Sequence, residues 1–199
     1  MSAPRIILAS GSAIRATILA NAGVDFEAIP APVDEREIES GLVAEGASPE
    51  DVALALAEAK ARAIAAANPS AFVIGADQTL DAGGDRWHKP GTRLEARAQL
   101  LALSGRSHRL HAAVVGAHGG EVRWRHVGTA AMTMRHLLPV QIDDYLDRAG
   151  EAALQSVGAY QVEGLGIRLF ERIDGDYFAI LGLPILPLLA WLRHEGVMD

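Results

Sequence analysis

The apolar run from Phe72 to Ala76 stops abruptly at Asp77, and this pattern constrains the fold more than any other part of the sequence. Consecutive apolar residues are typical of a strand that is covered on both faces by helices. The helix expected before it, from Ser48 to about Ala67, begins with an N-cap serine, a proline and two acidic residues. The run therefore predicts an α/β fold with Asp77 at the end of a buried strand, where open α/β sheets bind their ligands.

The rest of the chain alternates between strands and helices in the same way. A strand from Arg5 to Ala9 leads through a small polar turn into a helix from Ala13 to Ala22, and Gly23 terminates that helix. We expect further strands at 26–29, on both sides of 82–85 and of 118–120, at 167–173 and at 177–181; helices at 92–104, 139–149 and up to about 193; and a loop at 34–37. In the helix at 92–104 one face is formed by Leu94, Ala98 and Leu101. No linker or repeat divides these segments, so we expect one domain over residues 1–199, built on a mixed sheet.

Charge and composition exclude several classes of protein. The chain has 18 basic and 25 acidic residues, and its formal net charge of -7 has the wrong sign for a protein that grips a long nucleic acid by its phosphates. A small anion can still bind in a local basic pocket. There is no cysteine, which excludes disulfides and thiolate chemistry. The longest uncharged stretch, 178–192, is too short and too interrupted for a membrane span, and the opening MSAPRIILAS lacks the regions of a signal peptide. We therefore expect a cytoplasmic protein.

The turn around Ser10 and Ser12 is the first candidate site. Both hydroxyl groups lie where a strand ends and a helix begins, and Arg15 lies on the first turn of that helix. The free N–H groups of a helix N-terminus bind anions, so this turn is an anion site in principle. An alternative interpretation is that Ser12 serves only as an N-cap and Arg15 is a solvated surface residue.

Asp77 is the second candidate, because a carboxylate at the end of a buried strand is costly unless it has a partner. It could cap a neighbouring helix, pair with a cation or bind a metal. The candidate cations are Lys60, Lys89 and Arg106, although each is also explained as an ordinary helix-surface or loop residue. The phosphate-binding loop, dinucleotide-binding, zinc-protease and serine-hydrolase motifs are missing. The spacing of His108 and His111 would place the two rings on opposite faces of a strand, which argues against a zinc site.

Taken together in chain order, these motifs resemble the Maf family of nucleoside triphosphate pyrophosphatases from Leu8 to about Leu192. The segments that carry the resemblance are 8–12 (LASGS) with Arg15, 33–35 (VDE), 57–61 (AEAKA) with Lys60, 74–78 (IGADQ), Lys89-Pro90, 103–105 (LSG), 158–160 (GAY), 163–166 (EGLG) and 182–184 (GLP). Each segment alone is weakly specific, but the ordered set is highly specific. The chain departs from the family where a proline and an arginine pair usually follow the second serine, because Ala13, Ile14 and Arg15 stand there.

The resemblance implies an elongated α/β fold with a mixed sheet and two lobes around a cleft, similar to inosine triphosphate pyrophosphatase, and often a homodimer. It also implies cleavage of a nucleoside triphosphate to a monophosphate and pyrophosphate with Mg2+ or Mn2+. Asp77 would be the proton acceptor and, with Glu35, a metal ligand, while Arg15, Lys60 and Lys89 would face the phosphates. Glu35 could instead be one acid in a solvated charge run.

Three positions bear on the choice of base: Ile14, Gln78 and Glu163. Within the family, the branch that acts on thymidine and uridine triphosphates has arginine, threonine and glutamine there, and the 7-methyl-GTP branch has tryptophan, glutamine and glutamate. This chain matches the second branch at Gln78 and Glu163, so 7-methyl-GTP is the expected substrate. The alternatives are a dTTP/UTP pyrophosphatase of the same family and a nucleotide-binding regulator of septum formation. For Glu163 itself, the alternative is that it only pairs with a nearby arginine in a Gly-rich turn.

Overall fold

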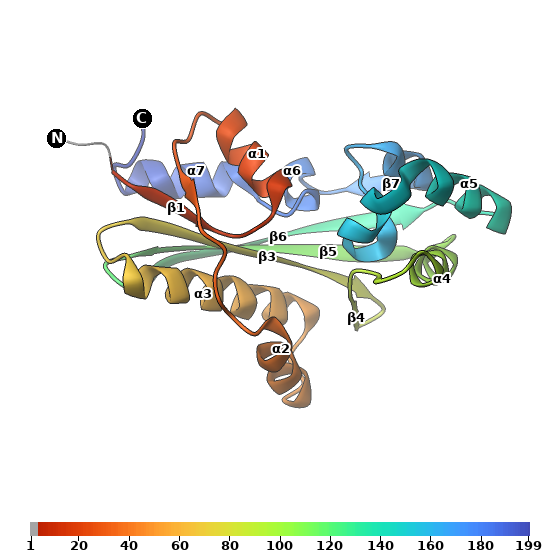
Figure 1. The fold of residues 1–199 in the computed structure, drawn as a ribbon, viewed down its shortest axis with the longest axis horizontal. Helices are drawn as coiled ribbons and strands as arrows, with labels where there is room; N and C mark the ends of the chain where they lie inside the picture. Colours follow the sequence, from red (N-terminus) through yellow and green to blue (C-terminus); the bar gives the residue numbers. More distant parts are fainter. Residues whose placement is uncertain (1–3) are drawn as a thin grey trace.

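A computed structural model describes residues 4–199, and it has a single open sheet with helices on both faces (Figure 1). Met1 to Ala3 of the opening sequence lie outside the described residues. The strands are β1 (Ile6–Ala9), β2 (Glu27–Ala28), β3 (Phe72–Ala82), β4 (Asp85–Trp87), β5 (Ser107–His118), β6 (Glu121–Met134) and β7 (Phe170–Asp174). The helices are α1 (Ala13–Asn21), α2 (Glu35–Ala44), α3 (Pro49–Ala67), α4 (Arg93–Leu103), α5 (Pro139–Ala149), α6 (Tyr177–Ile180) and α7 (Ile185–His194), with 3-10 turns η1 (Gly150–Gln155), η2 (Val157–Ala159) and η3 (Leu165–Leu169).

The sheet is mixed, as expected from the sequence. Its strand order is β2-β1-β3-β5-β6-β7, and β4 pairs with β3 outside this path. The pairings of β1 with β2 and with β3 are parallel, and the other pairings are antiparallel. Strands β3, β5 and β6 are long enough to run through both halves of the molecule (Figure 1).

Each half of the sheet carries its own core. In the half that contains β1, helix α3 covers one face and packs on Ala9, Val73 and Val115, while α1 and α7 cover the other face and pack on Leu8 and Ile74. In the other half, α4, α5 and the 3-10 turns pack around Leu80, Leu110 and Met132. These separate cores correspond to the two expected lobes.

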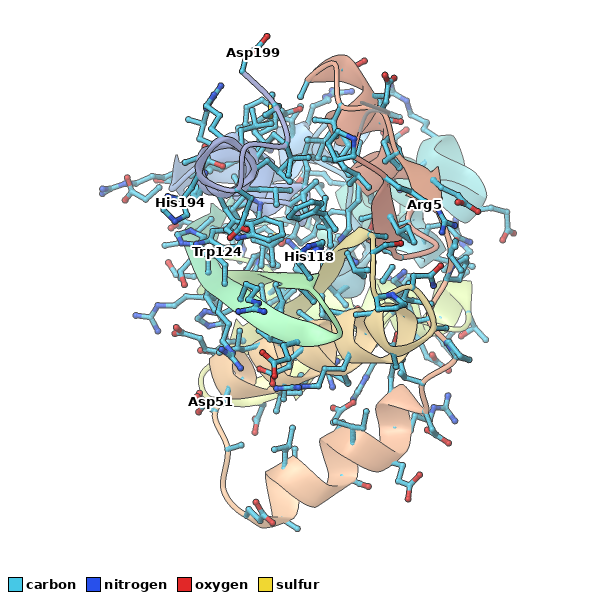
Figure 2. The ribbon with its side chains drawn as sticks, turned by 90° about the vertical axis from the view of Figure 1, so that its left-hand side faces the viewer. Arg5, Asp51, His118, Trp124, His194 and Asp199 are labelled. Atoms are coloured by element: carbon cyan, nitrogen blue, oxygen red, sulfur yellow. The ribbon has the colours of Figure 1, made fainter. Side chains whose placement is uncertain are left out.

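Aromatic rings pack together at one end of the first half, where Figure 2 labels His118 and Trp124. His118 stacks on Phe72 with a centroid distance of 4.0 Å, and Trp124 stacks on Trp191 at 5.7 Å. Figure 2 looks onto this end and shows α2 projecting away from the body of the protein, as Figure 1 also does. Within residues 4–199, no helix has both the length and the apolarity that crossing a membrane requires.

Three expected boundaries are wrong. Strand β3 does not end at Asp77 but continues to Ala82, because Gln78 to Asp81 keep the pairing with β5 and Thr79 and Leu80 are themselves buried. Residues 34–37 are not a loop: Asp34 accepts the N–H groups of Arg36 and Glu37 at 3.0 Å and so begins α2. Residues 177–180 form the short helix α6 instead of a strand, because the side chain of Asp176 caps the N–H of Ala179 at 2.8 Å.

Two smaller details also differ from the sequence interpretation. The buried face of α4 consists of Ala96, Leu100 and Leu103, whereas Leu94 is 76% exposed and Leu101 is 37% exposed. Strand β7 begins only at Phe170, since the residues before it form the 3-10 turn η3.

Candidate active site

Lys60 and Asp77 form a buried ion pair at the centre of the sheet. The ammonium of Lys60 lies 2.7 Å from Oδ1 of Asp77 and 2.6 Å from Oε1 of Glu35, so one cation is shared by two carboxylates. Lys60 and Asp77 are 8% and 6% exposed, while the Glu35 side chain is half exposed. Three residues that the sequence singled out separately therefore meet in one cluster, contributed by α3, β3 and α2.

The cluster lies beside an unpaired edge of β3. Strand β1 pairs with β3 only as far as Gly75, and β4 begins to pair only at Leu80. Between these points, the described strands leave residues 76–79 paired on one side alone, with β5. Because side chains alternate along a strand, Asp77 points to the α3 face and Gln78 to the opposite face. The unpaired edge thus leaves the middle of the sheet accessible at Asp77, although Asp77 is not at a strand end.

The oxygen atoms of Asp77 and Glu35 fit a divalent cation. Oδ2 of Asp77 is buried and has no hydrogen-bond partner among the described residues, so it has an unused lone pair beside Lys60. Residues 4–199 contain no group of three or more histidine, cysteine or acidic side chains placed to hold a metal. Two carboxylates are sufficient for Mg2+, which retains waters and takes further ligands from substrate phosphates. The residue types and the free oxygen are therefore compatible with such a site.

The loop before α1 is organised by its two serines. Oγ of Ser12 accepts the N–H of Arg15 at 3.5 Å and so caps α1. Oγ of Ser10 accepts the N–H of Ser12 at 3.3 Å and is itself buried. The loop and the first turn of α1 stand at the end of β1, next to the open edge of β3. This position suits the binding of an anion.

Arg15 is tied to three oxygen atoms of the protein and is not a solvated surface residue. Its guanidinium donates to the carbonyl of Ala76 at 2.8 Å, to the carbonyl of Gly182 at 2.9 Å and to Oγ of Ser10 at 3.2 Å. Burial lowers the pKa of Arg15 from its ordinary value, and the negative charges of Asp77 and Glu35 act in the opposite direction. Arg15 therefore connects the anion loop to the strand residue just before Asp77, and its contact with phosphate stays a prediction.

The three base-recognition candidates come from different parts of the molecule. Nε2 of Gln78 donates to the carbonyls of Ala179 and Ile180 at 3.0 and 2.9 Å, so this side chain holds α6. Ile14 is half-buried and packs against the core beneath α1. Glu163 is exposed and makes no ion pair with an arginine anywhere in residues 4–199, which removes the alternative explanation of that residue.

Lys89 and Arg106 do not join the cluster. Both are exposed, and no hydrogen bond or ion pair connects their side chains to Asp77 in the described part of the chain. Lys89 follows β4, which flanks the open edge of β3. Its role toward a substrate stays a prediction, whereas nothing supports a role for Arg106.

A second ionic cluster was not predicted from the sequence. Glu39 of α2 contacts Arg86 of β4 and lies 3.3 Å from Nε2 of His88. Helix α2 has no fully buried residue, and these contacts and the Glu35–Lys60 pair attach it to the body of the protein together with its packing on α3. The sequence feature that could have predicted this cluster is the spacing of Glu35 and Glu39. They fall on one helix face at i and i+4 once 35–44 is recognised as a helix.

Comparisons with known proteins identify a family and several similar proteins. The sequence model of the family described as Maf-like protein matches residues 5–195. A protein of Mesorhizobium japonicum named 7-methyl-GTP pyrophosphatase is 57% identical over 195 residues, covering 98% of both chains. A protein of Brucella abortus with the same name is 54% identical with the same coverage. A nucleoside triphosphate pyrophosphatase of Nitrobacter winogradskyi is 51% identical over 98% of this chain and 95% of its own length.

Proposed function

The chain belongs to the family of Maf-like proteins, and on this premise we propose that it hydrolyses nucleoside triphosphates to a monophosphate and pyrophosphate. The observation that carries the proposal is the sharing of Lys60 between Asp77 and Glu35 beside an anion-binding loop. A protein that only binds nucleotide has no need of a buried carboxylate with an unused oxygen atom at that position. The proposed reaction class is hydrolysis of a phosphoric anhydride.

The proposed mechanism assigns a role to each member of the cluster. Ser10, Ser12 and the amides of their loop bind the triphosphate at the N-terminus of α1, and Arg15 fixes that loop against β3. Lys60 and Lys89 offset charge that develops on the phosphoryl oxygens and the leaving pyrophosphate. Asp77 accepts the proton of the water that attacks the α-phosphorus.

Glu35 and Asp77 are the residues that would hold a divalent cation, Mg2+ or Mn2+. A bound cation of this kind supplies charge neutralisation and orients water. Lys60 contacts both carboxylates and reduces the repulsion between them. We further propose that 7-methyl-GTP is the preferred substrate, as the branch that the chain resembles implies, and that the protein is a homodimer, as the family resemblance implies. The lack of cysteine and of a signal-peptide pattern in the opening residues supports the proposal that it acts in the cytoplasm.

The test is a screen of purified protein against standard and modified nucleoside triphosphates that follows release of pyrophosphate. Asp77→Asn should lower turnover at least about a hundredfold, since the contribution of a general base is of order 10²- to 10⁴-fold. Asparagine is nearly isosteric, so circular dichroism should show an intact fold. The matched control is Asp85→Asn, an exposed aspartate of the same hairpin, which should retain full activity. A folded Asp77→Asn protein with more than a tenth of wild-type activity would exclude Asp77 as the base.

Removal of divalent cations with a chelator should abolish pyrophosphate release, and added Mg2+ or Mn2+ should restore it. Zinc should not be required. Full activity in excess chelator would contradict the metal roles of Glu35 and Asp77 together. Nucleotide binding without any release of pyrophosphate, in the presence of metal, would instead favour the regulatory alternative.

A further inference from the structure

A cavity of about 320 Å³ lies in the lobe that does not contain Lys60. It is bounded by α5, by η3 and by the residues that follow β6, and none of the candidate catalytic residues lines it. Asp77 lies on β3, whereas the cavity adjoins the β6 and β7 side of the sheet, with β5 between β3 and β6. Its size falls at the lower end of the range for pockets that bind small molecules, roughly 300–1,000 Å³.

Three arginines converge on this cavity although the protein is acidic overall. Arg148 lies 3.8 Å from Asp144, but Arg135 and Arg168 contact no carboxylate within residues 4–199. Arginines without a carboxylate partner also occur elsewhere in the described chain, Arg36 and Arg106 among them, but those two do not line this cavity. Two guanidinium groups without an acid, at one cavity, indicate an anionic ligand.

The structure holds one of these arginines in place before any ligand binds. The backbone N–H of Arg135 donates to the carbonyl of Leu169 at 2.9 Å, and its Nη1 donates to the carbonyl of Arg168 at 2.9 Å. One of five guanidinium N–H groups is used in this way, and the remaining groups are available. A guanidinium that is already oriented loses less entropy when it forms the paired hydrogen bonds that a phosphate accepts.

The rest of the lining fits the body of a mononucleotide. Leu137, Leu165 and Leu169 supply an apolar wall, and Val140 at the rim is 69% exposed, which leaves apolar surface open to a ring. Asp144 and Gln141 add an acceptor of N–H groups and an amide. A ligand that satisfies all of these groups has a phosphate, an apolar or planar body and N–H donors.

We propose that this cavity is a second, non-catalytic site for a mononucleotide, with the phosphate held by Arg135 and Arg168. The choice of a purine monophosphate as the ligand rests on the proposed function, because the proposed reaction releases one. The chemistry of the lining selects a phosphorylated ligand independently of that reaction.

Binding of GMP to the purified full chain, measured by isothermal titration calorimetry, tests the proposal. The double variant Arg135→Gln and Arg168→Gln should weaken one GMP binding event at least tenfold, since it loses the charge-assisted hydrogen bonds that both guanidinium groups donate to the phosphate. The matched control is Arg106→Gln, an exposed arginine of the same lobe that has no acidic partner and does not line the cavity. It should bind GMP as wild type does. Guanosine, which lacks the phosphate, should bind this site at least tenfold more weakly than GMP.

Val140→Glu provides an independent variant, because it places a negative charge at the exposed rim without emptying the core. It should weaken the same binding event, while pyrophosphate release by all variants stays within about twofold of wild type. The proposal is overturned if the arginine variants bind GMP as wild type does, if wild type binds no GMP, or if the variants lose turnover together with binding. Because binding is measured directly, a protein without pyrophosphatase activity could still confirm or refute the second site.

Discussion

Lys60 neutralises two carboxylates at once, so its removal should lower the stability of the folded protein. Lys60→Ala would leave Asp77 buried beside Glu35 without a cation, and the loss of one partner of a buried pair costs roughly 3–5 kcal/mol. Half of Glu35 is exposed to water, so we expect about 2–4 kcal/mol here. Urea unfolding measures this loss, and Mg2+ should recover part of it in the variant by binding the two carboxylates.

The matched control for this prediction is Arg62→Ala on the same helix. Arg62 pairs with Glu58 at i and i+4 and is half exposed, so its loss should cost less than about 1 kcal/mol and should not depend on Mg2+. If Lys60→Ala is as stable as this control and insensitive to Mg2+, the two carboxylates do not form the metal site that we propose.

At the same scale, Arg15 shows where reasoning from sequence ends. The pattern of two serines and an arginine at a strand-to-helix turn predicted the anion loop and its N-cap. It could not predict the acceptors of the guanidinium, because two of them are backbone carbonyls, 61 and 167 residues away, and backbone atoms leave no mark in the sequence. Arg15, which the sequence suggests as a phosphate ligand, therefore also connects three segments of the chain.

At the scale of elements, the packing of α3 on β3 sets the distance between Lys60 and Asp77. A Cβ atom on Gly75 would overlap the carbonyl of Ala57 and lie 2.7 Å from the amide nitrogen of Ala61. Gly75→Ala must therefore push α3 away from the sheet, and overpacking of this kind typically costs about 1–3 kcal/mol or more. We expect lower stability in urea and a loss of turnover that exceeds the loss of nucleotide binding.

Gly41→Ala is the corresponding control on α2. A Cβ atom there meets nothing within 4 Å, and the helix should gain about 0.5–1 kcal/mol from the better helix former. If Gly75→Ala matches wild type in both stability and turnover, the close approach of α3 to β3 is not what positions Lys60.

The misplaced boundaries have physical causes in the particular elements. The apolar run 72–76 predicted the first part of β3, but the strand continues through polar residues, of which Asp77 and Thr79 are buried and so give no apolar signal. The N-cap of α2 was visible at Asp34, yet the helix presents too few apolar residues to show a helical period, since it buries none of them. For α6, four residues are too few for any period to distinguish a helix turn from a strand.

At the scale of the whole molecule, His108 makes the stability of one lobe depend on pH. It lies in the core, where Nε2 contacts the Tyr160 hydroxyl at 2.6 Å and the ring packs against Phe170. Burial lowers the pKa of His108 from 6.5 to about 4. Between these values the unfolded chain binds a proton that the folded protein does not, so stability is complete above about pH 6.5 and falls toward pH 4, by up to roughly 3 kcal/mol.

Urea unfolding of wild type and of His108→Phe between pH 4 and pH 7.5 measures this contribution. The variant loses the bond to Tyr160 and should be less stable at pH 7.5, yet its stability should fall less between pH 6.5 and pH 4. His194→Gln, at an exposed position on α7, should keep the full dependence of wild type. Equal slopes for wild type and His108→Phe would show that His108 is not the residue responsible.

Base selection also belongs to the whole molecule, because its three candidates stand on α1, on β3 and on the turn before η3. Glu163 is exposed and free of arginine partners in the described chain, so its carboxylate is available to accept the two adjacent N–H groups of guanine's Watson–Crick edge. Its charge also favours a cationic methylated ring. Ile14 cannot stack on that ring as tryptophan does, which should broaden the preference for the base.

We predict a higher kcat/KM for guanine triphosphates, with 7-methyl-GTP foremost, than for dTTP or UTP. Glu163→Gln should narrow or reverse that ratio, whereas Glu171→Gln, exposed in the same lobe, should leave it unchanged. A tenfold preference of wild type for dTTP or UTP would refute the choice of base. It would leave the proposed pyrophosphatase chemistry standing, because Lys60 contacts both Asp77 and Glu35 on the other side of β3 from Gln78.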